Sequence, residues 1–99
     1  MNDSHEDHST ILHCDKRLSL ENIHTQKNIF IDVLAIKKPI IFDAHSLSYI
    51  DTAGLQLLLS VVLAADTNRI PWTWRQPSAA LLQCANLLGM SQLLKLPKK

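Results

Sequence analysis

The sequence predicts a single domain of the α/β (α+β) class, with helices packed on one four-stranded mixed sheet. Its 99 residues suffice for one domain but not for two, and 46% are hydrophobic, so the chain can bury a core. Three segments repeat apolar residues with a helical period, and short strand-like runs separate them in the order β-β-α-β-α-β-α. This alternation favours right-handed crossovers and helices packed against a sheet.

The N-terminal part predicts a tail followed by two short strands. Residues 1–8 are polar and are expected to form a flexible tail, so that the domain comprises residues 9–99. Strands are expected at residues 10–14 and 17–20. Asp15-Lys16 between them is expected to turn the chain back as a hairpin, although it lacks the glycine that tight hairpin turns favour.

A helix is expected over residues 23–37, with a buried strand directly after it. One helix face comprises Ile23, Phe30, Val33, Leu34 and Lys37. Polar residues fall mostly elsewhere on this helix, namely His24, Gln26, Asn28 and Asp32. Pro39 ends the helix. The unbroken apolar run at residues 40–42 predicts a strand covered on both faces, as in a parallel sheet.

The second helix is unusually apolar. A polar loop at residues 43–50 leads to a helix at 53–66, which either Asp51 or Thr52 caps with a side-chain oxygen. Between residues 55 and 65 only Gln56 and Ser60 are polar. This helix is therefore either buried over most of its circumference or exposes apolar surface to a partner.

The C-terminal part predicts a last strand and a last helix. The strand spans residues 70–76 and places Trp72 and Trp74 on one face, either packed under a helix or partly exposed for a partner or a dimer. Pro71 favours an edge position or the start of the strand. Ser78 caps a helix at residues 79–88, and Gly89 ends it as a left-handed C-cap.

Composition and motifs exclude several classes of function. The formal net charge is +1, from 10 basic and 9 acidic residues, which is unlike a nucleic-acid-binding protein. Two glycines rule out Gly-rich phosphate loops and no catalytic set is found, so neither enzyme activity nor a cofactor is expected. Cys14 and Cys84 have no zinc spacing, and no metal site is expected. With no signal peptide and no apolar run of about 20 residues, a cytoplasmic protein without membrane insertion is expected.

The segment from Asp43 to Leu55 carries the most distinctive chemistry. A strand ending in Asp43 leads through a hydroxyl-rich loop to Asp51-Thr52-Ala53-Gly54-Leu55, which opens the apolar helix. One interpretation is structural: the helix is capped, and Gly54 allows close backbone packing. The other is functional, because free N–H groups and the positive end of the helix dipole can hold a phosphorylated hydroxyl, and Thr52 is the hydroxyl placed for it.

This stretch resembles the signature of the STAS family, the sulfate-transporter and anti-sigma-factor-antagonist domain. In that family a strand ending in Asp is followed by Asp-Ser/Thr-small-Gly-Leu. Residues 72–90 are similar to the family's last strand and helix. Leu18-Ser19-Leu20-Glu21 resembles an early Leu-x-Gly-Glu segment, but Leu20 stands where glycine is usual. The resemblance covers residues 9–96.

The resemblance implies a non-enzymatic regulatory module that binds a protein partner. In anti-sigma-factor antagonists a cognate kinase phosphorylates the residue after the Asp, which is Thr52 here. The implied partner-binding surface comprises Asp43, Ser46, Ser48, Asp51, Ala53, Gly54 and Gln56. The implied partner is a serine-kinase-like anti-sigma factor or, from a similarity of the Trp-x-Trp-Arg region, a chemosensory protein. The alternatives are a small STAS subunit of a phospholipid-trafficking ABC transporter, which would bind an ABC ATPase, and a non-switching assembly subunit. The sequence leaves open whether the chain forms a homodimer.

Overall fold

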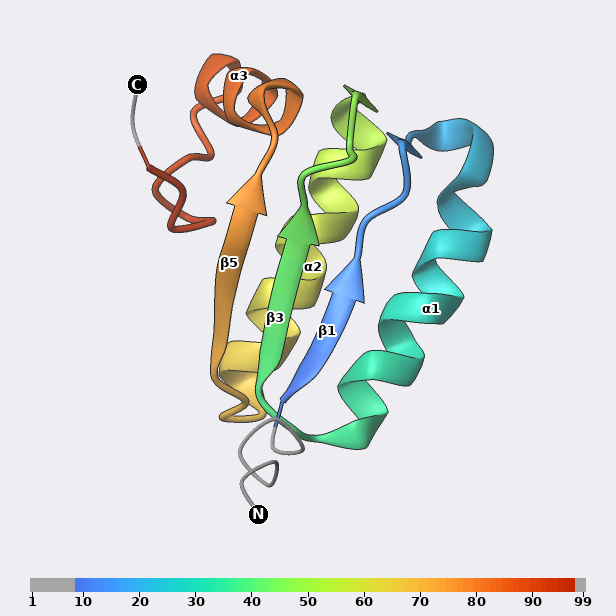
Figure 1. Cartoon of the computed structure of the whole chain (residues 1–99), viewed down its shortest axis with the longest axis vertical. Coiled ribbons are helices and arrows are strands. Elements are labelled where there is room, and N and C mark those ends of the chain that lie inside the picture. Colours follow the sequence, from blue (N-terminus) through green and yellow to red (C-terminus); the bar gives the residue numbers. More distant parts are fainter. Residues whose placement is uncertain (1–8, 98–99) are drawn as a thin grey trace.

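A computed structural model of the chain describes residues 9–97 (Figure 1). The tail expected at residues 1–8 therefore lies outside the described residues. The strands are β1 (Thr10–His13), β2 (Arg17–Leu18), β3 (Ile40–Ala44), β4 (Tyr49–Ile50) and β5 (Trp72–Pro77). The helices are α1 (Ile23–Ile36), α2 (Thr52–Thr67) and α3 (Ala79–Leu87), and a short 3-10 helix, η2 (Leu20–Asn22), precedes α1. The predicted α/β fold class with three helices is confirmed.

The strands differ from the prediction in number and direction. Within the described residues they form a three-stranded sheet of order β1-β3-β5 and a separate two-stranded pair, β2-β4. Every pairing is parallel. The four-stranded mixed sheet is thus replaced by two parallel sheets, and the predicted loop at residues 43–50 contains the end of β3 and all of β4.

The predicted hairpin at Asp15-Lys16 is wrong because the chain does not reverse there. The backbone N–H of Cys14 donates to the carbonyl of Asp43, and the carbonyl of Lys16 accepts from the N–H of Ser48 at 2.8 Å. The chain therefore runs on beside the β3–β4 segment, so that β1 pairs with β3 and β2 with β4. A two-residue hairpin turn needs residues with positive φ, and neither Asp15 nor Lys16 has one.

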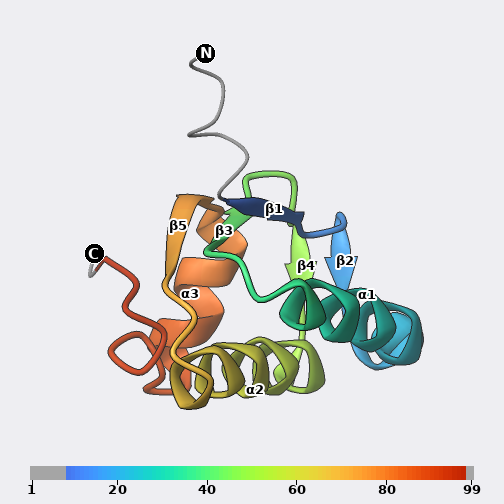
Figure 2. The same ribbon diagram turned by 90° about the horizontal axis from the view of Figure 1, so that it is seen from below.

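All three helices lie on one side of the three-stranded sheet (Figure 2). The core between these layers is apolar, and its largest fully buried side chains include Phe30, Phe42, Leu12, Leu55 and Leu58. α2 turns a broad face to this core, with six buried residues: Gly54, Leu55, Leu58, Val61, Val62 and Ala65. Of the two predictions for this helix, burial over much of its surface fits better than exposure of an apolar surface to a partner. Leu63, at 51% exposed, departs from this pattern.

Helix α1 differs from its predicted faces at two positions. Gln26, which was expected mostly off the apolar face, is buried on the same face as Phe30 and Val33. The spacing of four and three residues explains this placement, because such neighbours share one side of a helix. Lys37, which was expected on the apolar face, is the exposed C-cap and adopts a left-handed backbone with φ 62°.

The two tryptophans lie on one face of β5, an edge strand, as predicted. Both are half-buried and pack on Phe42, with ring centroids 5.8 and 5.1 Å away for Trp72 and Trp74. The indole N–H of Trp72 donates to Asp66, and that of Trp74 donates to the carbonyl of Leu94, each at 2.8 Å. These bonds fasten the end of α2 and the C-terminal segment to the sheet.

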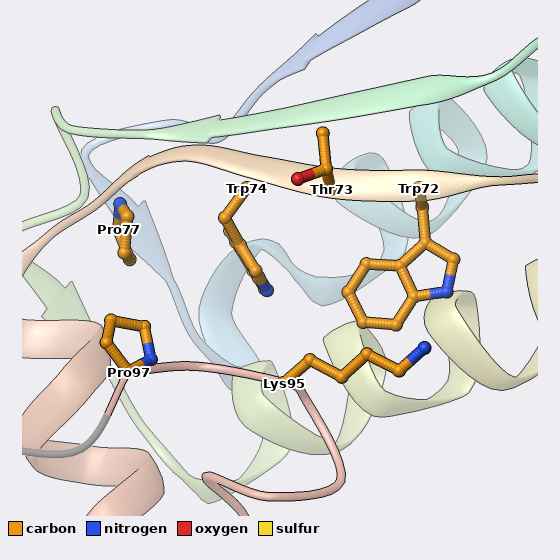
Figure 3. Close-up of a pocket in the computed structure, with 6 residues that line it drawn as sticks. All are labelled: Trp72, Thr73, Trp74, Pro77, Lys95 and Pro97. Atoms are coloured by element: carbon orange, nitrogen blue, oxygen red, sulfur yellow. The ribbon is translucent and has the colours of Figure 1, made fainter.

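A pocket of about 290 Å³ lies between β5 and the C-terminal segment (Figure 3). It is lined by Trp72, Thr73, Trp74, Pro77, Lys95 and Pro97. The ammonium group of Lys95 lies 5.1 Å from the centre of the Trp72 ring, within the range of a cation–π contact. Because both indole N–H groups are bonded within the domain, Trp72 to the end of α2 and Trp74 to the C-terminal segment, the indole N–H groups are not free to bind a ligand.

Candidate functional site

Asp51 is the N-cap of α2, which settles the choice between Asp51 and Thr52. One carboxylate oxygen accepts from the N–H of Gly54 at 2.9 Å, and the other accepts from the N–H of Leu20 at 3.0 Å. These two hydrogen bonds lower the pKa of Asp51 below its ordinary value of 3.8, and the bond from Leu20 has the larger effect. A charged carboxylate therefore joins the start of α2 to the segment after β2.

Thr52 is the first residue of α2 and is exposed. Its hydroxyl makes no hydrogen bond to any residue between 9 and 97, and the helix is capped by Asp51 instead. Ala53 beside it is half-buried, and Gln56, one turn further along, is exposed. The hydroxyl is accessible at the positive end of a helix of 16 residues, where an anionic group is favoured.

Gly54 allows α2 to begin very close to β2. A Cβ atom at this position would collide with the carbonyl oxygen of Leu18 and lie 2.7 Å from its carbonyl carbon. The obstacle is backbone, which cannot rotate away as a side chain can. The structural interpretation of Gly54, close backbone packing, therefore has a defined contact partner.

Asp43 lies at the carboxyl end of β3 and is only 6% exposed. Its carboxylate accepts from the backbone N–H of His45 at 3.2 Å and lies 3.0 Å from that residue's Nδ1. The Nδ1 of His13 is 3.5 Å from the other oxygen. The hydrogen bonds from His45 outweigh the effect of burial and lower the pKa of Asp43. The carboxylate thus faces its own loop and two imidazoles.

Ser46 and Ser48 lie in the loop between β3 and β4, and both are exposed. The hydroxyl of Ser46 is 3.3 Å from Nε2 of His45, and that of Ser48 donates to the carbonyl of Lys16 at 3.2 Å. The residues proposed from the sequence therefore form two groups, one in the first turns of α2 and one from Asp43 to Ser48. Both follow the carboxyl ends of parallel strands, at the same end of the domain (Figure 1).

The sequence interpretation missed exposed apolar and aromatic residues beside the first group. Leu20 donates its N–H to Asp51 and is 71% exposed, and Tyr49 is 48% exposed. The guanidinium group of Arg17 lies 4.5 Å from the centre of the Tyr49 ring and 3.3 Å from the carboxylate of Glu21. One signal was available, because Leu20 occupies the position at which the STAS pattern has glycine.

Metal sites, reactive thiols and membrane-spanning helices each have structural requirements with which the described residues can be compared. That part of the chain holds no group of three or more metal-ligating side chains. Cys14 and Cys84 are free thiols, and burial raises the pKa of Cys14 to about 12, so that it stays protonated at neutral pH. None of the described helices has the length and apolar character needed to cross a membrane.

Comparisons with known proteins agree with this architecture. A search of curated proteins finds no match. The NMR structure of the protein TM1081 is similar, with a TM-score of 0.74 and 19% sequence identity over 94% of this chain and 76% of that one. At this identity the likeness shows the fold. The family model described as the STAS domain matches residues 1–99, and this chain belongs to the STAS domain family.

Proposed function

We propose that this chain is a non-enzymatic regulatory module of the anti-sigma-factor-antagonist type, which exchanges protein partners when Thr52 is phosphorylated. The observation that carries the proposal is the exposed Thr52 hydroxyl at the N-terminus of α2. Asp51, directly before it, caps the helix, and the Thr52 hydroxyl makes no hydrogen bond within residues 9–97. We place the protein in the cytoplasm, where a cognate serine/threonine kinase and the partner would meet it.

The partner would bind the surface around the start of α2. Leu20 and Tyr49 supply exposed apolar area, and Arg17, Glu21 and Gln56 supply exposed polar groups. Aromatic side chains and arginine are enriched at protein–protein interfaces. The partner class is a serine-kinase-like anti-sigma factor, with a chemosensory protein as the second candidate.

A phosphate on Thr52 would change this surface without removing a contact that holds the fold. It adds about −1.5 to −2 charges beside Asp51, whose lowered pKa keeps it ionised at neutral pH. The helix dipole favours the added charge, so the domain should stay folded. A partner docking there would meet two adjacent anionic groups and would have to desolvate them, which weakens binding.

The test compares partner binding by wild-type protein, phosphorylated protein, Thr52→Ala and Thr52→Glu, with the partner captured by pull-down and identified by mass spectrometry. Phosphorylated protein and Thr52→Glu should lose binding and stay folded, whereas Thr52→Ala should resist phosphorylation and bind. Thr67→Glu is the matched control, because Thr67 is exposed at the other end of α2, about 22 Å along the helix. Equal affinities for all forms would leave Thr52 with no switching role.

The alternatives predict different outcomes of the same test. A small STAS subunit of a phospholipid ABC transporter should capture an ABC ATPase. A non-switching assembly subunit should bind its partner equally well with and without phosphate on Thr52. A homodimer would appear as a doubled molar mass in light scattering.

A further inference from the structure

A second pocket, of about 340 Å³, lies between the end of β1 and helix α1. Its lining comes from the β1–β2 connection, from α1 and from the β3–β4 loop, and comprises His13, Cys14, Asp15, Lys16, Gln26, Ile29 and Ser46. It therefore lies beyond the carboxyl end of β1, and in open α/β sheets ligands bind outside the carboxyl ends of the strands. Its volume is within the range of small-molecule sites.

Gln26 is the feature of this pocket that packing does not explain. The residue is 6% exposed and lies on the core-facing stripe of α1 with Phe30 and Val33. Its amide makes no hydrogen bond to any residue between 9 and 97, and its polar atoms are not sealed from solvent, so they reach the pocket. An apolar side chain would fill a core position at lower cost, since a buried amide needs a partner. Water or a ligand that enters the pocket can therefore bond to the Gln26 amide.

The rim of the pocket is held in place before any ligand arrives. The backbone N–H of Cys14 donates to the carbonyl of Asp43 at 2.9 Å. The carbonyl of Lys16 accepts from the N–H groups of Ser48 and Tyr49, at 2.8 and 3.1 Å, and from the Ser48 hydroxyl. Both ends of the segment from Cys14 to Lys16 are thus tied to the β3–β4 segment. A fixed rim lowers the entropic cost of binding a small molecule.

The charges on the rim define the ligand that fits. Lys16 carries an ammonium group in no ion pair with a described residue, and Asp15 beside it carries a carboxylate with one oxygen bonded to the N–H of Lys16. The Gln26 amide can both donate and accept, and Ile29 adds an apolar wall that is 44% exposed. We propose that this pocket binds a small zwitterion of the α-amino-acid type, with its carboxylate toward Lys16, its ammonium toward Asp15 and Gln26 bonding to it from the floor.

The test is an NMR titration of the full chain at millimolar concentrations of small L-α-amino acids, with acetate, methylammonium and phosphate at matched ionic strength. At least one amino acid should produce saturable shifts in the Gln26 side-chain amide and in the backbone amides of residues 13–16. Acetate, methylammonium and phosphate, which lack one of the two charges, should bind more weakly. Phosphate or acetate binding as tightly as the best amino acid would overturn the assignment, as would the absence of saturable shifts with every amino acid.

Variants separate the site from unspecific binding. Gln26→Leu should keep or raise the melting temperature and abolish the saturable shifts, whereas Asn28→Leu, an exposed position on the same helix, should retain them. Asp15→Asn and Lys16→Met should each weaken binding by about tenfold, the effect of losing one charge-assisted hydrogen bond. These two exposed positions keep the proposal testable if Gln26→Leu fails to fold. Wild-type affinity in Gln26→Leu, or in both rim variants, would refute the site.

Discussion

Replacing Asp51 with alanine should destabilise the domain through two separate contacts. Loss of the N-cap bond to Gly54 costs about 1 kcal/mol. Loss of the bond to the N–H of Leu20 adds about 0.5–1 kcal/mol, because Asp51 is only half-buried and water partly replaces it. The free energy of unfolding should therefore fall by about 1.5–2 kcal/mol, which for a domain of this size lowers the melting temperature by about 6–16 °C.

The same variant should lose its effect in acid. Because the folded-state pKa of Asp51 is lowered, its carboxylate stabilises the fold fully above the unfolded-state pKa, about 3.9, and this stabilisation disappears as the pH falls through the lower folded-state value. Urea unfolding at a series of pH values from 7 down to about 3 measures the difference between wild type and Asp51→Ala. That difference should be constant near neutral pH and shrink in acid.

Two further variants separate the contacts of Asp51. Asp51→Asn keeps one acceptor oxygen at a position where Asn caps helices as well as Asp, so it should lose only the contribution of the Leu20 bond. Asp32→Ala removes an exposed carboxylate from α1 and is the matched control, expected to change stability by less than about 0.5 kcal/mol. If Asp51→Ala were as stable as Asp32→Ala, or if its deficit persisted unchanged in acid, the account of Asp51 as a charged double acceptor would be refuted.

Gly54→Ala should lower the free energy of unfolding by roughly 1–3 kcal/mol, because its Cβ would overlap the carbonyl of Leu18; an unchanged urea midpoint would show that α2 can move away at no cost. Trp74→Phe keeps most of the ring contact but removes the bond to the carbonyl of Leu94, so it should cost about 1 kcal/mol in thermal unfolding, and no change would mean that water replaces the bond fully. Asp43→Ala should destabilise the domain at neutral pH and progressively less in acid, because the pKa of Asp43 is lowered in the fold; a pH-independent deficit in the same urea series would contradict this.

The start of α2 was readable from sequence because its determinants are local. A cap residue, a hydroxyl and a glycine lie within four positions, and each acts on a neighbouring backbone group. Even so, the sequence left the cap undecided between Asp51 and Thr52. The bond from the N–H of Gly54 to Asp51 decides it, and the second bond to Asp51, from Leu20 31 positions away, has no sequence signal of its own.

Strand pairing and one helix face were not readable in the same way. Residues 10–14 and 17–20 satisfy strand propensity whether they pair with each other or with β3 and β4, because propensity says nothing about the partner. Gln26 was expected off the apolar face of α1 because it is polar, yet it is buried with Phe30 and Val33 on the face toward the core. A polar residue on a core face is where pattern and structure are expected to disagree when a site is present.

At the start of α2, helix capping and the proposed phosphorylation fall on two different residues, which gives a physical reason for a switch at this position. Asp51 supplies the hydrogen bonds that hold the helix start, and its neighbour Thr52 supplies none to residues 9–97. A modification of Thr52 therefore acts on charge at the surface and leaves the capping bonds in place. If one residue both capped the helix and accepted the phosphate, phosphorylation would remove a capping bond worth about 1 kcal/mol while it changed the interface. Under the proposed function, separating the two roles onto adjacent residues would let phosphorylation of Thr52 change partner affinity while the stability of the domain does not change.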